Sequence, residues 1–196
     1  MVNINQQYYQ NNAQRFYEST IDVDMQSLYQ HFLPLVKTNG RILDAGCGTG
    51  RDSKNFIDLG FEVEAFDASE KLATLASSLI NQTVKVDFFE TYDNDKPFDA
   101  IWACASLLHV PHKDLATVFK SLTTLLNNQG IFYCSFKYGD EQVERGGRLF
   151  SNLTEASFTQ KIADLPLEII KQWKTGDLRE GRASEKWLNI IMRKVV

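Results

Sequence analysis

The chain has 196 residues, of which 43% are hydrophobic and 12% aromatic, so it can form one sizeable core but is too short for two full domains. Its formal net charge of -4 provides no global positive field, and nucleic acid is therefore not expected as a partner. The three cysteines fit neither a zinc spacing nor a disulfide framework, and no signal core or membrane-spanning apolar stretch is found. We expect a cytoplasmic protein with no metal site and no membrane contact; the sequence carries no signal for its oligomeric state.

Residues 1–36 are predicted to form a helical N-terminal arm that precedes an α/β core over 40–196, the two together forming one domain. Residues 1–20 are rich in Asn, Gln and Tyr and have no strong period, so we expect a loose helical arm there rather than a core element. Over 24–36, apolar side chains recur at helical spacing. This pattern predicts an amphipathic helix with Pro34 near its end.

Short apolar runs alternate with longer amphipathic segments after Gly40. The predicted strands are 41–45, 61–66, 84–87, 98–103 and 130–136, and the predicted helices between them are 51–59, 69–80 and 112–126. Alternation of strand and helix implies right-handed crossovers and a parallel sheet with helices on both faces. The sequence therefore predicts a doubly wound α/β fold.

The last third of the chain departs from this alternation. A helix is predicted to begin with Ser151 or Thr154 as its N-cap and to end before Pro166. Two strand-like runs follow, 167–174 and 186–195, with a turn-rich segment between them. This arrangement predicts an antiparallel hairpin at the end of the sheet.

Three glycines, Gly46, Gly48 and Gly50, lie between the first predicted strand and the next helix, and Asp44 precedes them at the strand end. An α/β sheet binds its ligand at the carboxyl ends of its strands. Glycine lets a ligand approach the backbone closely, and the N–H groups at a helix start can face a carboxylate or a phosphate. The spacing is G-x-G-x-G, whereas dinucleotide-binding loops have G-x-G-x-x-G. The alternative is a tight turn that binds no ligand.

Carboxylates also follow the second and third predicted strands. Asp67 is placed to accept hydrogen bonds from both ribose hydroxyls of a nucleoside cofactor, although it could equally cap the next helix. Asp87 is placed to accept from the exocyclic amine of adenine, with Phe88 beside the ring; a solvated turn is the alternative. Small residues from Ala103 onward leave room for a cofactor and a reacting group.

Four segments, taken as a set, carry a family resemblance: 44–53, 65–69, 106–111 and 130–137. They resemble the class I S-adenosylmethionine-dependent methyltransferases, especially the small tellurite-resistance-like members, over about residues 5–195. The resemblance implies a seven-stranded, mostly parallel sheet with a reversed last hairpin, S-adenosylmethionine as cofactor, and methyl transfer to a small-molecule acceptor.

The same resemblance assigns roles around the cofactor. Gly46 and Gly48 would lie against its amino-acid end, Asp67 would hold the ribose, and Phe88 would border the adenine. The full set of expected cofactor contacts is Asp44, Gly46, Cys47, Gly48, Arg51, Asp67, Ala68, Asp87, Phe88 and Ala103. The side chains expected to close over the methionyl carboxylate are Arg51, Tyr8 or Tyr9, and Arg15.

The family's C-terminal third predicts where the acceptor binds. The expected substrate contacts are Tyr138, Arg145, Arg148, Arg179, Arg182 and Trp187. Guanidinium groups beside aromatic rings suit a small anionic or aromatic acceptor. The alternative is that these arginines form surface ion pairs with acids such as Glu144, Asp177 and Glu180.

The expected reaction is in-line displacement at a sulfonium methyl group, for which positioning does most of the catalysis. His109 would lie near the methyl group, either as a general base or as a hydrogen-bonded spacer. Two rival interpretations are an NAD(P)-dependent oxidoreductase, which the glycine spacing and terminal hairpin disfavour, and a non-catalytic sensor or partner-binding protein that keeps the cofactor pocket.

Overall fold

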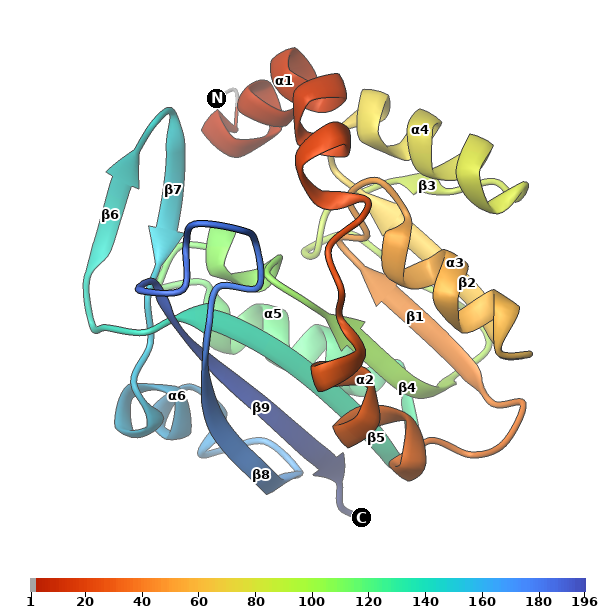
Figure 1. Cartoon of the computed structure of the whole chain (residues 1–196). Helices are drawn as coiled ribbons and strands as arrows, with labels where there is room; N and C mark the ends of the chain where they lie inside the picture. The colour runs from red at the N-terminus through yellow and green to blue at the C-terminus, as the bar shows by residue number, and fades with distance from the viewer. Residues whose placement is uncertain (1–2) are drawn as a thin grey trace.

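The computed structural model describes residues 3–196, so the first two residues of the predicted arm lie outside it. Its large sheet is built from β1 (Arg41–Ala45), β2 (Glu62–Asp67), β3 (Lys85–Val86), β4 (Phe98–Ala103), β5 (Leu126–Lys137), β8 (Leu167–Gly176) and β9 (Lys186–Lys194). The strand order is β3-β2-β1-β4-β5-β9-β8 (Figure 1). Within the sheet, β3, β2, β1, β4 and β5 pair with their neighbours in parallel, and β9 runs antiparallel to both β5 and β8. The predicted doubly wound sheet with a reversed terminal hairpin is confirmed.

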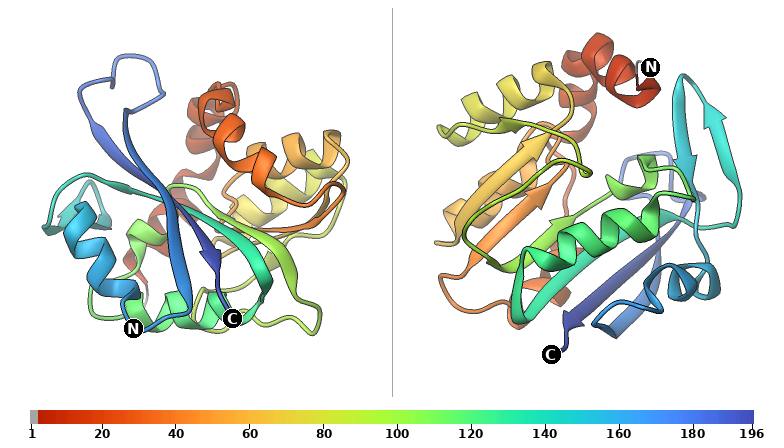
Figure 2. Two further views of the ribbon diagram at one scale, coloured as in Figure 1. Left: turned by 90° about the horizontal axis from the view of Figure 1, so that it is seen from below. Right: turned by 180° about the vertical axis from the view of Figure 1, so that it is seen from behind.

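Helices cover both faces of this sheet, as Figures 1 and 2 show from opposite sides. They are α1 (Ile4–Thr20), α2 (Gln26–Phe32), α3 (Arg51–Asp58), α4 (Glu70–Ile80), α5 (Leu115–Thr124) and α6 (Glu155–Ile162), with short 3-10 turns η1 (Leu33–Leu35) and η2 (Leu107–His109). Successive strand residues point to opposite faces. Accordingly Ile42 packs among residues of α2 and α3, whereas Leu43 packs among those of α5 and α6.

Aromatic side chains fill the α2–α3 side of the core. Trp102 of β4 stacks on Tyr133 of β5 with ring centroids 3.9 Å apart, and Phe32 and Phe56 pack against the same indole. All four side chains are fully buried. Burial of one such side chain contributes roughly 1.5–3 kcal/mol, so this cluster firmly supports the strands whose ends carry the site.

Most predicted boundaries agree closely with the structure, and β1 and β4 coincide with them. The largest shift is at β5, which begins at Leu126, within the segment predicted as the end of a helix. The start of this strand could not be predicted from the apolar pattern, because the side chains of 127–129 are polar and half-buried or exposed. The pairing of β4 with β5 is also irregular there.

The N-terminal segment is more ordered than a loose arm. The Asn3 side chain accepts hydrogen bonds from the N–H groups of Asn5 and Gln6 and so caps α1, which bends at Asn12, where the backbone is not helical. Figure 1 shows α1 across the top of the molecule, above the strand ends. Its weak amphipathic pattern follows from its position, because it covers a cavity rather than the core.

A second small sheet, β6 (Gln142–Arg145) and β7 (Arg148–Ser151), was not expected as strands. The two residues between them, Gly146 and Gly147, have φ of 57° and 74°. Positive φ at both central positions is the requirement of the tightest hairpin turn, which a Gly-Gly pair meets without steric cost. The Gly-Gly pair was the sequence signal for this hairpin.

The C-terminal elements agree with expectation. Thr154 caps α6, its hydroxyl accepting from the N–H of Ser157 in a reciprocal capping box. β8 and β9 then form the predicted antiparallel hairpin, and the loop between them folds back toward α1 (Figure 1).

Candidate functional site

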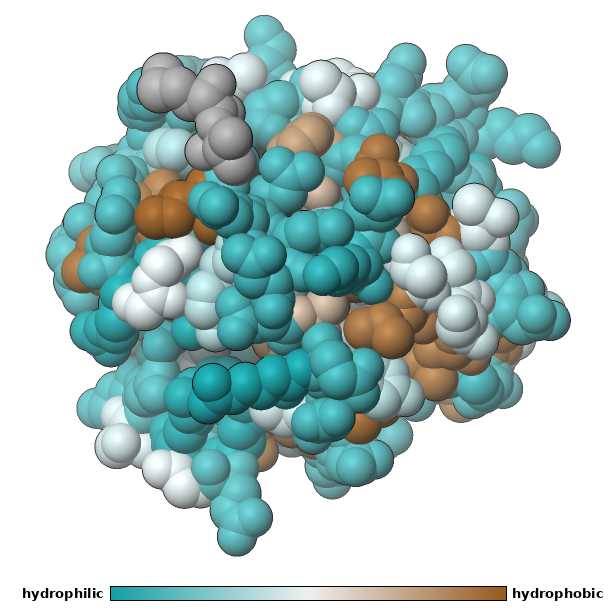
Figure 3. All heavy atoms as spheres, turned by 90° about the horizontal axis from the view of Figure 1, so that it is seen from above, coloured by the Kyte–Doolittle hydropathy of each residue, from teal (hydrophilic) through white to brown (hydrophobic). Residues whose placement is uncertain are grey.

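A cavity of about 250 Å³ opens at the carboxyl ends of β1, β2, β4 and β5. α1 covers it, and the β6–β7 hairpin and the β8–β9 loop form one wall. Figure 3 looks down on this end of the molecule, whose surface is mostly hydrophilic with small hydrophobic groups between. The cavity stands where an α/β sheet binds its ligands.

The glycine loop forms the floor of the cavity. Gly46, Gly48 and Gly50 have backbone φ angles of 75°, 58° and 83°, values that residues other than glycine rarely adopt. A Cβ atom on Gly46 would lie 2.7 Å from the Cβ of Ser106, so the turn after β4 leaves no room for one. The loop is held against β2, whose Phe66 carbonyl accepts from two of its N–H groups.

Asp67 faces the cavity from the end of β2. Its two carboxylate oxygens accept hydrogen bonds from the N–H of Gly48 at 2.9 Å and the N–H of Ser69 at 2.8 Å. Each oxygen keeps a further lone pair for a ligand hydroxyl. Burial raises the pKa of Asp67 to about 6. The side chain that caps α4 is Ser69, so the helix-cap alternative for Asp67 is not what the structure shows.

Asp44 lies beneath the loop, 2% exposed, and accepts a hydrogen bond of 2.5 Å from the Ser53 hydroxyl. Burial, aided by the nearby Asp52 carboxylate, raises its pKa to about 8. Cys47 of the loop also lines the cavity, and burial raises the pKa of its thiol well above the ordinary value. A thiol held neutral in this way is a poor nucleophile.

Arg51 lines the cavity but is anchored by a carboxylate that pattern reading missed. Its guanidinium makes two hydrogen bonds to Asp52, from Nε at 2.7 Å and Nη2 at 3.1 Å. Asp52 also accepts from the hydroxyl of Tyr29 at 2.6 Å and the indole N–H of Trp102 at 2.7 Å. Burial alone would raise the pKa of Asp52, but the Arg51 charge and these donors bring it below its ordinary value. The sequence signal for this role of Asp52 was the presence of two aromatic residues, Tyr29 and Trp102, whose polar groups need an acceptor when they are buried.

Asp87 and Phe88 line the cavity on the β3 side. One Asp87 oxygen accepts from the N–H of Phe88 at 2.8 Å and from the hydroxyl of Thr91 at 2.5 Å. Asp87 therefore caps the turn after β3 and is half-buried at the cavity wall. Both expectations for it, turn residue and cavity residue, describe part of its position.

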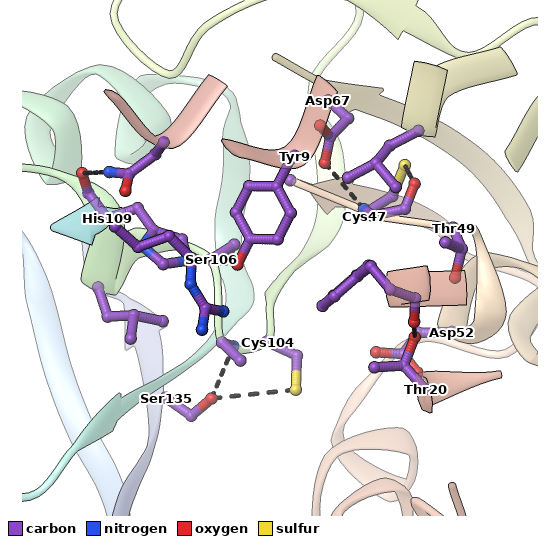
Figure 4. A pocket seen from close by; sticks show the side chains of 18 of the residues that line it. Tyr9, Thr20, Cys47, Thr49, Asp52, Asp67, Cys104, Ser106, His109 and Ser135 are labelled. Atoms are coloured by element: carbon purple, nitrogen blue, oxygen red, sulfur yellow. Dashed lines mark hydrogen bonds between the residues drawn. The ribbon is translucent and has the colours of Figure 1, made fainter. Parts of the chain in front are cut away.

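Tyr9 and His109 meet in the cavity. The Leu149 carbonyl lies 2.8 Å from Nδ1 of His109 and can only accept, so Nδ1 carries the proton and Nε2 accepts the Tyr9 hydroxyl at 2.8 Å. Burial lowers the pKa of His109 to about 4. Figure 4 shows the Tyr9 ring between His109 on one side and Asp67 and Cys47 on the other. His109 is thus a neutral, hydrogen-bonded residue.

α1 is tied to both sides of the cavity, which was not expected. The buried Asn5 amide donates to the His109 carbonyl at 3.0 Å and accepts from the N–H of Leu149 at 2.8 Å. Gln6 donates to the Ala68 carbonyl at 3.1 Å on the opposite side. These contacts join segments far apart in the chain, so no local pattern announces them.

The four expected arginines separate into distinct environments. Arg179 makes a two-point ion pair with Asp177, and Arg182 lies 3.9 Å from a Glu185 oxygen. Arg145 is exposed on the hairpin and does not line the cavity. Arg148 lines the cavity. The ion-pair alternative therefore describes Arg179 and Arg182, although Glu185 was not among the acids named for it.

Several expected residues do not line the cavity: Tyr8, Arg15, Ala103, Tyr138 and Arg145. Arg15 is exposed on α1, and Ala103 is fully buried in β4, one residue before the cavity wall begins at Cys104. The Tyr138 hydroxyl donates to Glu155 at 3.1 Å and accepts from Lys174 at 3.0 Å. All other expected contacts, including Ala68 and Trp187, line it.

Over residues 3–196, no helix combines the length and the apolar character that a membrane crossing requires. Within the same range, no three His, Cys, Asp or Glu side chains converge as a metal-binding group would.

Comparison with known proteins identifies the family of the chain. A family model described as a methyltransferase domain matches residues 14–154. The Bacillus subtilis protein YqeM, which is named as a methyltransferase, is 32% identical over 112 residues, which cover 52% of this chain and 45% of that protein. This chain spans less than two thirds of the length of the curated relatives it matches.

Solved structures share the fold over nearly the whole chain. The N1-methyltransferase of 1,6-didemethyltoxoflavin from Burkholderia thailandensis, solved with S-adenosylhomocysteine, has a TM-score of 0.75 at 18% identity, covering 98% of this chain and 88% of that one. The N-methyltransferase NodS from Bradyrhizobium japonicum, also solved with S-adenosylhomocysteine, has a TM-score of 0.75 at 14% identity, covering 98% and 99%. The narrower resemblance to tellurite-resistance-like members stays a prediction. Because the family model matches well over half of the chain, the protein belongs to the methyltransferase domain family.

Proposed function

We propose that this chain binds S-adenosylmethionine on the glycine loop and transfers its methyl group to a small-molecule acceptor by in-line displacement. The observation that carries the proposal is Asp67, a carboxylate that lines the cavity and is oriented by two backbone N–H groups, with lone pairs left for a ligand. That donor and acceptor set suits a pair of ribose hydroxyls. Family membership and neighbours solved with S-adenosylhomocysteine support the choice of nucleoside.

The residues around Asp67 fit the rest of such a cofactor. Gly46 and Gly48 line the cavity with backbone at positive φ, which lets the amino-acid end of the cofactor approach the main chain closely. Asp87 and Phe88 line the β3 side of the cavity, from which they would contact the adenine amine and ring. Arg51, held by Asp52, has guanidinium N–H groups left for the methionyl carboxylate.

The cofactor supplies a methyl group on a positively charged sulfur, and the chain's own residues provide position and shelter from water. α1 covers the cavity, with Tyr9 directed into its centre (Figure 4). The acceptor would occupy the side walled by His109, Arg148 and Trp187. Holding two reactants in attack geometry contributes up to several kcal/mol without any covalent or metal chemistry.

We assign His109 a positioning role rather than that of general base. Its Nε2 already accepts the Tyr9 hydroxyl, and burial, with the nearby Arg148 and Lys137 charges, disfavours the imidazolium that a base would become. Tyr9 is the group of this pair that touches the acceptor. An acceptor with a lone pair and no proton to lose suits such a site best.

Calorimetry with S-adenosylhomocysteine, NAD and NADP tests the cofactor. Of the three compounds, we expect only S-adenosylhomocysteine to bind. If NAD binds and S-adenosylhomocysteine does not, the result would instead support an oxidoreductase. Methyl transfer from labelled S-adenosylmethionine to a panel of small molecules then separates an enzyme from a sensor. A chain that binds the cofactor and labels no member of a broad panel would count against catalysis.

A further inference from the structure

Arg148 is a cation in the cavity wall that no carboxylate neutralises. Among residues 3–196, no Asp or Glu forms an ion pair with it. Its Nε atom is buried and has no hydrogen-bond acceptor. Leaving a buried, charged donor without an acceptor is unfavourable, so this arrangement needs a reason.

The other cations that line the cavity are all paired, which makes Arg148 the exception. The pairs are Arg51 with Asp52, Lys137 with Glu185, Arg179 with Asp177, and Arg182 with Glu185. A carboxylate lies beside each of these groups, although Lys137 and Arg182 share Glu185. Among the cations that line the cavity within residues 3–196, Arg148 is the one without a carboxylate partner.

Aromatic rings surround Arg148 instead of acids. Its guanidinium carbon lies 4.4 Å from the ring centre of Tyr8, 5.0 Å from that of Phe150 and 5.9 Å from that of Tyr9. Ring faces stabilise a cation and orient its plane, but they offer no strong acceptor for its N–H groups. The rings therefore hold the guanidinium in place. Apart from the Tyr9 hydroxyl, whose pKa burial raises and the Arg148 charge lowers, they give its N–H groups no acceptor, and Nε has none.

The position of Arg148 also places it on the acceptor side. It begins β7, next to the hairpin turn, and Phe150 two residues on packs against His109 with ring centres 5.2 Å apart. The acids expected to contact the cofactor, Asp67 and Asp87, line the β2–β3 side. The cavity is thus acidic at one end and carries its unpaired cation at the other.

We propose that the acceptor is an organic carboxylate whose anionic group binds Arg148 in a two-point hydrogen bond, with a flat apolar part against the neighbouring rings. A guanidinium matches a carboxylate in geometry and donates two parallel hydrogen bonds to it. This inference rests on the proposed methyl transfer for its biological meaning, because it names the class of molecule that would receive the methyl group.

Calorimetry of the full chain, with and without saturating S-adenosylhomocysteine, tests the site with benzoate and its neutral counterpart benzamide at millimolar concentration. We expect benzoate to bind and benzamide to bind far more weakly. Arg148→Met should lower the affinity for benzoate about tenfold to hundredfold, and Arg148→Lys should lower it less, because a positive charge remains. Arg145→Met, on the same hairpin but outside the cavity, should behave as the unchanged chain does.

Equal binding of benzoate and benzamide, no benzoate binding, or undiminished binding to Arg148→Met would each overturn the carboxylate site. Retained affinity for S-adenosylhomocysteine shows that each variant is folded. The same titrations separate the two proposals: a chain that binds S-adenosylhomocysteine but not benzoate keeps the methyltransferase function and loses the acceptor class. A chain that binds benzoate through Arg148 but not S-adenosylhomocysteine does the reverse.

Discussion

The Tyr9 hydroxyl lies 2.8 Å from Nε2 of His109, and this hydrogen bond joins α1 to the 3-10 turn after β4. The proton of the imidazole is on Nδ1, because the Leu149 carbonyl beside it can only accept. A second proton, on Nε2, would turn this acceptor into a donor toward the Tyr9 hydroxyl and place a charge in a buried site. The pair therefore favours the neutral imidazole.

This preference predicts a loss of stability in mild acid. Because the pKa of His109 is about 4 in the folded chain and about 6.5 when unfolded, only the unfolded chain takes up this proton between those values. The free energy of unfolding should fall by about 2–3 kcal/mol from this group as pH drops through that range. Urea unfolding of the unchanged chain and His109→Gln measures it; parallel pH profiles would contradict it.

Asp67 predicts a pH dependence of cofactor binding. Ribose hydroxyls donate to the ionised carboxylate, whose pKa is about 6 in the free protein because of burial. Affinity for S-adenosylhomocysteine should therefore decrease as pH falls through about 6 and rise to a plateau above it.

Removing the Asp67 carboxylate gives the matching test. Asp67→Ala should weaken the binding of S-adenosylhomocysteine by roughly 1.5–3 kcal/mol. Asp67→Asn should also bind it weakly, and its affinity should depend less on pH. Calorimetry at several pH values measures both. If Asp67→Ala binds as tightly as the unchanged chain, the ribose assignment is wrong.

Asp52 should be the most sensitive carboxylate of α3. Asp52→Asn removes the negative charge from beneath Arg51 and weakens the hydrogen bonds of Tyr29 and Trp102, so we expect a cost of about 3–5 kcal/mol. Asp58→Asn is the matched control, since Asp58 forms only an exposed pair with Lys54 on the same helix. Urea unfolding followed by tryptophan fluorescence compares them, and similar costs would show that Asp52 is not a structural anchor.

Asn5 should hold α1 closed over the cavity. Asn5→Ala leaves the His109 carbonyl and the Leu149 N–H without their partner, so α1 should open more readily, by roughly 1–3 kcal/mol. Faster hydrogen exchange in the first turns of α1 and weaker binding of S-adenosylhomocysteine are the expected readouts. Asn11→Ala, at an exposed position of the same helix, is the control. Unchanged exchange in Asn5→Ala would show that other contacts dominate the docking.

The parts of the fold that were predictable are those in which local chemistry decides the outcome. β1 is buried throughout and flanked by turn residues, so its apolar run marks its ends. The glycine loop was equally readable, because its backbone requires residues without side chains. β5 was harder, since Leu126 and Ile131 pair with β4 on either side of a polar stretch, 127–129, that interrupts the ladder, and no local period reflects this pairing.

The candidate site was less predictable because its contacts join distant segments. Asn5 and His109 are 104 residues apart, and nothing near either one announces their hydrogen bond. The arginines show both cases. Arg179 lies beside Asp177, two residues away and named in the sequence analysis as a possible partner, whereas Arg148 lies beside three rings, two of which come from α1. Only the folded arrangement shows the surroundings of Arg148.

The bend in α1 at Asn12 has a thermodynamic consequence. The part of the helix before the bend touches both ends of the cavity, through Asn5 near His109 and through Gln6 at Ala68. A ligand at either end that favours the docked helix therefore prepares the other end as well. By reciprocity, whatever the cofactor adds to the affinity of the acceptor, the acceptor must add equally to the affinity of the cofactor. A single helix would thus make the two partners of the reaction assemble together.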